Sequence, residues 1–329
     1  MKRARPKCAI MPCLLLFAAS LAFGQAGGQS SGQVPGTIVF AALKGPSGIG
    51  MIRLFDAPPT LQGATLRMVA VASADLMAAK VISGEYDVAV LPVNMAAKIR
   101  RSGVPIVLAA IVGDGMVSFL TSDGSVRSLA DLKGREIYVA GQGATPDYLV
   151  QKLLRNAGLD PAKDLRLSYS LPYPEMAAAI AGGKIRYAVL PEPFTTLALA
   201  ANPSLASPID LGALWTAATN QTSYPMTALV VNGKLAAERP AAMKALLAAV
   251  ADSIAWVKAQ PAAAAALVEK HEFGLKAQVA ERAIPRSAYV YVPAPVARPA
   301  VEALLKVFLD TAPASVGGKL PDDAFYASF

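Results

Sequence analysis

Short apolar runs alternate with amphipathic segments along most of this chain, which is typical of an α/β protein. The apolar runs are rich in β-branched residues and are bounded by glycine or proline, so they predict buried strands. The amphipathic segments that end at glycine predict helices. The predicted strands are residues 37–41, 66–70, 88–91, 105–112, 117–121, 136–140, 187–190 and 224–231. The predicted helices are 51–55, 73–82, 95–100, 146–157, 176–181, 240–259, 261–270, 276–283 and 299–311, and the chain after residue 231 is expected to be helical.

Residues 136–194 contain a complete strand, loop, helix and strand unit. The first strand of this unit runs into Gly141-Gln-Gly-Ala-Thr-Pro146, where Thr145 is expected to cap a helix and Pro146 to take its first position. The second strand runs into Pro191-Glu-Pro-Phe194. Both loops therefore leave the carboxyl ends of strands.

The same unit occurs earlier in the chain. Moving back by 99 residues places Gly183-Lys-Ile-Arg-Tyr-Ala-Val-Leu-Pro191 on Gly84-Glu-Tyr-Asp-Val-Ala-Val-Leu-Pro92. The strand at 136–140 falls on 37–41 with the same offset. A repeat this long predicts two similar lobes, because solenoid repeats are usually about 20–50 residues long. The alternative is that such strand entries are common to α/β proteins and agree here by coincidence.

The amino-terminal residues have the pattern of an export signal. Four basic residues precede a short apolar run and small residues near Gly24 and Ala26, and no lipid-attachment cysteine follows them. We expect residues 1–26 to be a signal peptide and 27–36 a disordered tether, which leaves a periplasmic or secreted protein. Removing the signal takes away Cys8 and Cys13, the two cysteines of the chain, and lowers the formal net charge from +8 to +4.

The remaining chain is expected to form two doubly wound lobes with a ligand cleft between them. Lobe one is predicted at 37–113 plus 225–329, with the carboxyl-terminal helices, and lobe two at 114–224. Two crossings, near 113–118 and 222–226, would form a hinge. In open α/β sheets, ligands bind beyond the carboxyl ends of the strands, where helix amino termini present free N–H groups. The loops 43–48, 92–95, 141–146 and 191–194 are thus expected to line one cleft.

Eight side chains on or near these loops are candidates for ligand binding. Ser47, Asn94 and Thr145 have an alternative role as helix caps. Glu192 lies between two prolines, which restrict the backbone, although it could also be a surface carboxylate. The predicted polar lining is Lys44, Ser47, Asn94, Gln142, Thr145 and Glu192, with Tyr173 and Tyr224 as walls.

These loops and strand entries together resemble the solute-binding proteins of ABC importers. The similarity is to the nitrate, taurine/sulfonate and thiamine-pyrimidine-precursor group (NMT1/SsuA-like), which has the type II periplasmic-binding fold, and it covers about residues 37–270. Its carriers are Lys44-Gly-Pro-Ser-Gly48, residues 84–92, Asp131-Leu-Lys-Gly134, residues 141–146, residues 191–194 and Tyr224-Pro-Met-Thr227. The resemblance implies a monomer that captures a small solute by closure of two lobes and delivers it to a membrane permease. It does not identify the solute.

Other function classes are less consistent with the sequence. His271 is the only histidine and stands on a predicted helix without a second histidine for a zinc pair. The loop 141–146 lacks the Gly-Lys-Ser/Thr ending of a phosphate-binding loop. No Lys/Arg stripe with interleaved aromatics indicates nucleic-acid binding. We therefore expect no catalysis, no cofactor and no metal. A ligand-sensing protein of a signalling system is the alternative, because the same lobes serve as sensors.

The chemistry of the solute is predicted from Glu192, which is expected to face Lys44 across the cleft. A carboxylate would repel a bare oxyanion such as nitrate and would accept a hydrogen bond from an N–H donor. Amino-pyrimidine-like or amino-sulfonate-like solutes are therefore expected.

Overall fold

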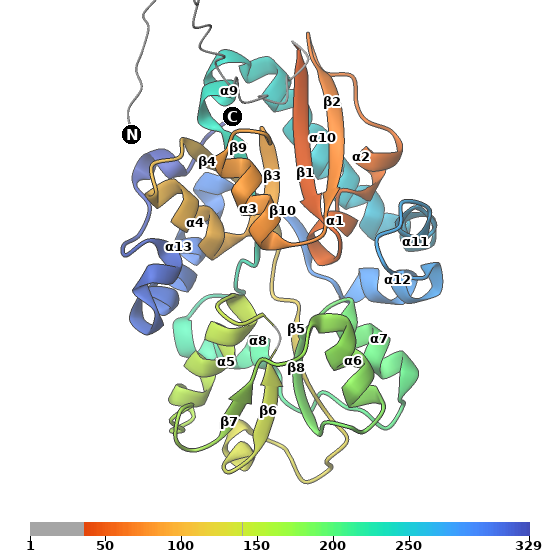
Figure 1. The fold of residues 1–329 in the computed structure, drawn as a ribbon, viewed down its shortest axis with the longest axis vertical. Helices are drawn as coiled ribbons and strands as arrows, with labels where there is room; N and C mark the ends of the chain where they lie inside the picture. Colours follow the sequence, from red (N-terminus) through yellow and green to blue (C-terminus); the bar gives the residue numbers. More distant parts are fainter. Residues whose placement is uncertain (1–35, 140) are drawn as a thin grey trace, which may run out of the picture. The chain divides into compact units, whose positions relative to one another are not determined.

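A computed structural model describes residues 36–139 and 141–329. The predicted signal peptide, all but the last residue of the predicted tether, and Ala140 lie outside the described residues. Two β-sheets organise the described part of the chain, with strand orders β10-β4-β9-β3-β1-β2 and β5-β8-β6-β7 (Figure 1). The strands are β1 (Thr37–Leu43), β2 (Thr65–Val71), β3 (Val88–Pro92), β4 (Ile106–Gly113), β5 (Val117–Thr121), β6 (Glu136–Val139), β7 (Arg166–Ser168), β8 (Tyr187–Pro191), β9 (Thr227–Asn232) and β10 (Tyr289–Pro293).

Helices cover both sheets, which confirms the predicted α/β fold with two lobes (Figure 1). Those from the first part of the chain are α1 (Pro46–Ile49), α2 (Ile52–Asp56), α3 (Ala74–Ile82) and α4 (Val93–Arg101). The four-stranded sheet carries η1 (Leu129–Leu132), α5 (Thr145–Asn156), α6 (Tyr173–Ala181), α7 (Phe194–Ala201) and α8 (Leu211–Thr219). The carboxyl-terminal part adds α9 (Gly233–Glu238), α10 (Pro240–Ala259), α11 (Pro261–Lys270), α12 (Ala277–Ala283), η2 (Ile284–Arg286), α13 (Ala294–Thr311), η3 (Pro313–Val316) and η4 (Asp323–Phe325).

The two sheets share one topology, as the sequence repeat predicts. The order β9-β3-β1-β2 in the larger sheet matches β5-β8-β6-β7 in the smaller one. Strand β1 pairs in parallel with β2 and β3, and β6 pairs in parallel with β7 and β8. Antiparallel β9 joins β3 where antiparallel β5 joins β8. The predicted internal repeat is therefore a repeat of supersecondary structure.

Two crossings connect the lobes. The first runs from the end of β4 at Gly113 to the start of β5 at Val117, and the second enters β9 at Thr227. The N–H of Met226 donates to the carbonyl of Gly113 at 3.0 Å, so the crossings are bonded to each other. The strands of the six-stranded sheet fall within 37–113 and 225–329, and those of the four-stranded sheet within 114–224. The exact domain boundaries stay a prediction.

Helix α10 packs into the core of the larger lobe. Its buried face includes Met243, Leu246 and Val250, which belong to the hydrophobic cluster under the six-stranded sheet. Among the described residues, this helix alone is long and apolar enough, by length and composition, to span a membrane. The packing of its buried face explains that composition, because a core helix also needs an extended apolar surface.

The carboxyl-terminal region departs from the predicted run of helices. Residues Tyr289–Pro293 form β10, which pairs antiparallel with β4 at the edge of the six-stranded sheet. The prediction that all the chain after residue 231 is helical was therefore wrong. Helix α13 also begins at Ala294, with Pro299 inside it, so the predicted start at 299 was late. The predicted elements did not include β7, α7, α8 or α9.

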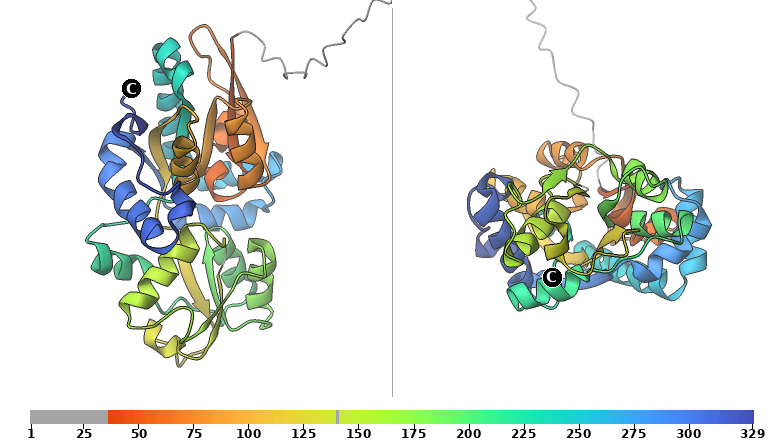
Figure 2. Two further views of the ribbon diagram at one scale, coloured as in Figure 1. Left: turned by 60° about the vertical axis from the view of Figure 1, so that its left-hand side comes forward. Right: turned by 90° about the horizontal axis from the view of Figure 1, so that it is seen from below.

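Helix α13 contacts both lobes. It packs on β4 and β10 in the larger lobe and on α5 in the smaller one (Figure 2). The rings of Tyr148 on α5 and Phe308 on α13 have centroids 4.4 Å apart, and Arg155 donates to the Thr311 hydroxyl at 3.3 Å. The carboxyl-terminal helix thus adds a non-covalent connection between the lobes.

Candidate functional site

A cavity of about 660 Å³ lies between the two lobes. Its walls come from loops that follow β1, β2, β3, β6 and β8, together with the two crossings. Each of the four loops predicted to line the cleft contributes at least one lining residue. The lining segments and residues are 43–44, 47, 72–75, 92, 94–95, 98, 116, 141–146, 148, 173, 191, 194, 226–227 and 315.

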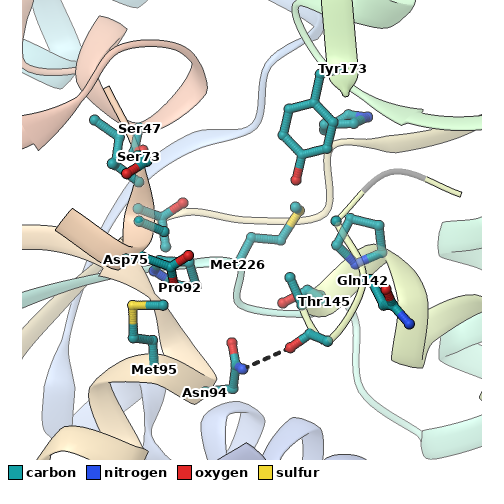
Figure 3. A pocket seen from close by; sticks show the side chains of 18 of the residues that line it. Ser47, Ser73, Asp75, Pro92, Asn94, Met95, Gln142, Thr145, Tyr173 and Met226 are labelled. Atoms are coloured by element: carbon teal, nitrogen blue, oxygen red, sulfur yellow. Dashed lines mark hydrogen bonds between the residues drawn. The ribbon is translucent and has the colours of Figure 1, made fainter. Parts of the chain in front are cut away.

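Six of the eight candidate side chains lie on this cavity. Ser47, Asn94 and Tyr173 are among them, and Figure 3 shows the Tyr173 hydroxyl directed into the cavity. Ligand binding by these residues stays a prediction. The six are Lys44, Ser47, Asn94, Gln142, Thr145 and Tyr173.

Asn94 connects the two lobes across the cavity floor. Its Nδ2 donates to the carbonyl of Gly143 at 3.1 Å (Figure 3). The Gly143 loop is held from its own lobe, because the Asp147 carboxylate accepts the Gly143 N–H at 2.9 Å. Asp147 also accepts from Tyr169 at 2.6 Å and from Gln151 at 2.7 Å. These bonds hold the Gly143 loop in position to accept the bond from Asn94.

Asn94 and Thr145 each keep an unused polar atom. Asn94 is 7% exposed and Thr145 is 2% exposed, and Asn94 Oδ1 and Thr145 Oγ1 are buried without a hydrogen-bond partner in the structure. A buried polar atom left unpaired costs about 1–3 kcal/mol. Asn94 Oδ1 is an amide oxygen and can only accept a bond, whereas the Thr145 hydroxyl can donate or accept.

The alternative of helix capping does not apply to the three residues for which it was considered. The N-cap residues of α1, α4 and α5 are Gly45, Pro92 and Ala144. Thr145 is the first residue of α5 and Pro146 the second, so the predicted cap was one residue too late. Ser47 and Asn94 lie within the first turns of their helices.

Glu192 does not line the cavity, and its predicted position facing Lys44 is wrong. Its Oε1 accepts from Arg286 Nε at 2.8 Å, and its Oε2 accepts from the Thr196 N–H at 3.1 Å. Only 2% of Glu192 is exposed. The carboxylate is therefore held by the first turn of α7 and by a cation from the carboxyl-terminal region.

Tyr224 is also absent from the cavity wall. It is 1% exposed and packs edge-on against Trp215, with ring centroids 5.7 Å apart. Its hydroxyl accepts from the Val117 N–H at 3.3 Å, and burial raises its pKa. Tyr224 is thus a core residue that joins the two crossings.

The cavity also has a group of apolar lining residues that were not among the predicted site residues. Met116 and Met226 come from the two crossings, and Met95 comes from the first turn of α4. Methionine adapts its shape and is polarizable, so these side chains suit an organic body more than an inorganic ion. Met226 lies within Tyr224-Pro-Met-Thr227, a motif that could have pointed to it. Ser315, from η3, had no signal in the sequence.

The cavity has more cationic than anionic lining. Lys44 and Lys98 lie on its wall with Asp75, and all three are exposed. Helices α3, α4 and α5 begin at the wall, and their amino termini carry partial positive charge. Burial raises the pKa of the Tyr173 hydroxyl, which keeps it neutral and able to donate. The site can therefore offer hydrogen-bond donors and an apolar surface, together with the unpaired Asn94 Oδ1 and Thr145 Oγ1.

Metal-ligating side chains do not gather in the part of the chain that the structure describes. No cluster of three or more His, Cys, Asp or Glu side chains could hold a metal there. The single histidine, His271, lies within 3.1 Å of the Asp56 carboxylate on the surface of the larger lobe. It is not among the residues that line the cavity.

Two α/β lobes with a cavity between them are characteristic of solute-binding proteins, and known structures agree with this class. An ABC transporter from Parabacteroides distasonis is similar with a TM-score of 0.77 and 28% identity, over 89% of this chain and 99% of that one. The periplasmic aliphatic sulphonate binding protein SsuA from Escherichia coli gives a TM-score of 0.67 at 21% identity, over 84% and 88% of the two chains. The periplasmic nitrate-binding protein NrtA from Synechocystis PCC 6803 gives 0.63 at 14%, over 85% and 84%.

The chain belongs to the NMT1-like family, whose model matches residues 53–270. This confirms the resemblance found in the sequence. No curated protein is a significant match in sequence.

Proposed function

We propose that this protein is the solute-binding component of an ABC import system. It captures a small solute between its lobes, closes around the solute and delivers it to a membrane permease. The observation that carries the proposal is the cavity, whose walls come from both lobes and are bridged by Asn94 and Gly143. A ligand that touches both walls binds the closed form more tightly than the open form, and only such differential binding shifts the two populations. The family membership supports the same role.

The proposed solute is a small organic molecule that carries an N–H or O–H donor, either amino-pyrimidine-like or amino-sulfonate-like. The donor would pair with Asn94 Oδ1, which accepts from no group in the structure, and Thr145 Oγ1 would take a second bond. This assignment replaces Glu192 as the acceptor. The volume of about 660 Å³ lies within the range of pockets that enclose organic ligands. Met95, Met226 and Tyr173 would cover the apolar part.

We also propose that the protein is exported and that it acts in the periplasm as a monomer without catalysis. Residues 1–26 would be removed on export, and the mature form would therefore lack Cys8 and Cys13. Intact-mass measurement of the exported protein tests this step. A mature species that retains either cysteine would contradict it.

Titration calorimetry with Asn94→Ala and Thr145→Ala tests the site. The ligand panel should hold amino-sulfonates, amino-pyrimidines and alkane sulfonates without a donor. We expect the tightest ligand to carry a donor and each variant to bind it about tenfold more weakly, the effect of one lost hydrogen bond of about 1.4 kcal/mol. Asn156→Ala is the matched control, because Asn156 is exposed at the end of α5 and outside the cavity lining. Binding unchanged in both cavity variants would refute the assignment.

A further inference from the structure

A half-buried ion pair joins the two lobes beside the first crossing. Glu192 follows β8 of the four-stranded sheet, and Arg286 ends η2, just before β10 of the six-stranded sheet. Glu192 Oε1 accepts from Arg286 Nε at 2.8 Å. The glutamate side chain is 3% exposed, whereas that of the arginine is 48% exposed. The carboxylate is thus fixed in its own lobe, and the cation reaches it from the other lobe.

The backbone on each side of this pair is bonded to the same crossing. The N–H of Glu192 donates to the carbonyl of Met116 at 2.9 Å. On the other side, the N–H of Asp114 donates to the carbonyl of Ala288 at 2.9 Å. Residues 114–116 therefore lie between the two partners along these bonds. Any rotation of the lobes that bends this crossing changes the separation of Glu192 and Arg286.

The first crossing also has a feature that the second does not share. At the matching position of the sequence repeat, Val93 replaces Glu192, and its side chain is 1% exposed in the hydrophobic core. Of the described contacts, only the one at the first crossing is an ion pair between the lobes. Such a pair has a strict distance requirement, because a buried carboxylate that loses its cation is left poorly solvated.

We infer that Glu192 and Arg286 are a positioning pair that restrains the angle between the lobes. The pair acts through the first crossing and touches no ligand. This inference rests on the proposed closure of the lobes, but the restraint itself is a property of the ligand-free protein. Without Arg286, the two lobes sample a wider range of angles.

Distance measurements between spin labels in the ligand-free protein test this restraint. Because Cys8 and Cys13 are the only cysteines, replacing both with serine gives a background for specific labelling. Labels at Lys184→Cys and Lys258→Cys place one probe on an exposed position of each lobe. We expect Arg286→Ala to give a broader interlobe distance distribution than the background protein. Arg286→Lys, which keeps the charge, is expected to narrow that distribution again in part.

A matched arginine serves as the control. Arg298 Nε donates to Glu302 Oε1 at 2.7 Å within α13, and the same guanidinium also donates to Asp323. Arg298→Ala therefore removes arginine–carboxylate bonds that do not join the lobes. We expect its distance distribution to equal that of the background. If Arg286→Ala does not fold, Glu192→Gln provides the test instead. It keeps the shape of the side chain, removes its charge, and is expected to broaden the distance distribution.

A distribution that stays unchanged in folded Arg286→Ala or in Glu192→Gln overturns the inference. The same holds if Arg298→Ala broadens the distribution as much as Arg286→Ala does. Because no solute is present, failure of the proposed solute binding leaves this result unaffected.

Discussion

The loops after β3 and β8 begin alike and end with different roles. Both strands end in Val-Leu-Pro and are 99 residues apart. The next N–H in each copy donates to a methionine carbonyl of a crossing, from Val93 to Met226 at 3.3 Å and from Glu192 to Met116 at 2.9 Å. The backbone is therefore repeated together with its attachment to the hinge.

The side chains that follow differ completely. In the first copy, Val93 enters the core and Asn94 spans the cavity. In the second copy, Glu192 holds Arg286, and the position that corresponds to Asn94 is Pro193. The comparison teaches that a sequence repeat locates strand ends and hinge bonds, but it does not say which side chains face a ligand.

Placing the side chain of one copy in the other tests this comparison. We expect the largest loss of stability when Val93, in the first lobe, is replaced by the glutamate of the second copy. Val93→Glu buries a carboxylate among apolar side chains without a cation. We expect it to lower the free energy of unfolding by about 3–5 kcal/mol, the usual cost of an uncompensated buried charge. Urea denaturation measures this loss. A variant of wild-type stability would show that the core at Val93 is open to water.

We expect the second largest loss of stability when the support of the Gly143 loop is removed. Asp147→Ala removes the carboxylate that accepts from Gly143, Tyr169 and Gln151, and we expect a loss of about 1.5–3 kcal/mol. Hydrogen exchange at the Gly143 amide should also become faster. Asp210→Ala is the control, because Asp210 caps α8 in the same lobe through the Ala213 N–H. Equal acceleration at Gly143 in the control would contradict a specific role for Asp147.

The reciprocal substitution, Glu192→Val, should lower the free energy of unfolding by less. In Glu192→Val, Arg286 is half exposed and can return to water, so we expect a loss of only about 1 kcal/mol. The same urea denaturation applies. A loss as large as that of Val93→Glu would mean that the two positions are equally intolerant, and the comparison would fail.

Much of the fold was predictable from local pattern. Strands β3 and β5 and helices α10 and α11 lie within about a residue of their predicted positions, because apolar runs and proline mark their bounds locally. Strand β10 was not predictable in this way. Its partner β4 is far away in sequence, and the pairing supplies the hydrogen bonds that fix the segment as a strand.

The candidate site was predictable only as far as the strand-end rule reaches. That rule located the loops of Asn94 and Thr145, which do line the cavity. It could not exclude Glu192, because the partner of Glu192 is Arg286, which lies 94 residues further along the chain. Tyr224 was misplaced for a similar reason, since its contact with Trp215 depends on how α8 packs.

The smallest expected effect concerns stability at acid pH. It distinguishes the contribution of an aspartate in the second lobe from that of an aspartate in the hinge. Hydrogen bonds from Ser125 and Tyr187 hold the pKa of Asp123 below its usual value of 3.8. Its stabilising contribution is therefore present above pH 3.8 and is lost as the pH falls through the lower folded-state pKa. Thermal unfolding of Asp123→Asn should depend less on pH below about pH 4 than that of the wild type.

Asp114 in the first crossing has the opposite sign. Burial raises its pKa, so its ionisation opposes folding as the pH rises above 3.8. Asp114→Asn should therefore not reduce the acid sensitivity. If it flattens the pH profile as Asp123→Asn does, the assignment of acid sensitivity to the second lobe is wrong.

Native mass spectrometry tests the central claim, that the cavity between the lobes holds a small solute. The folded protein would be incubated with a size-filtered extract of host small molecules and compared with the Asn94→Ala/Thr145→Ala double variant. We predict one adduct of a single small-molecule mass per chain in the wild type, and its loss in the variant. An adduct of equal occupancy in the double variant, or none in the wild type, would contradict the claim.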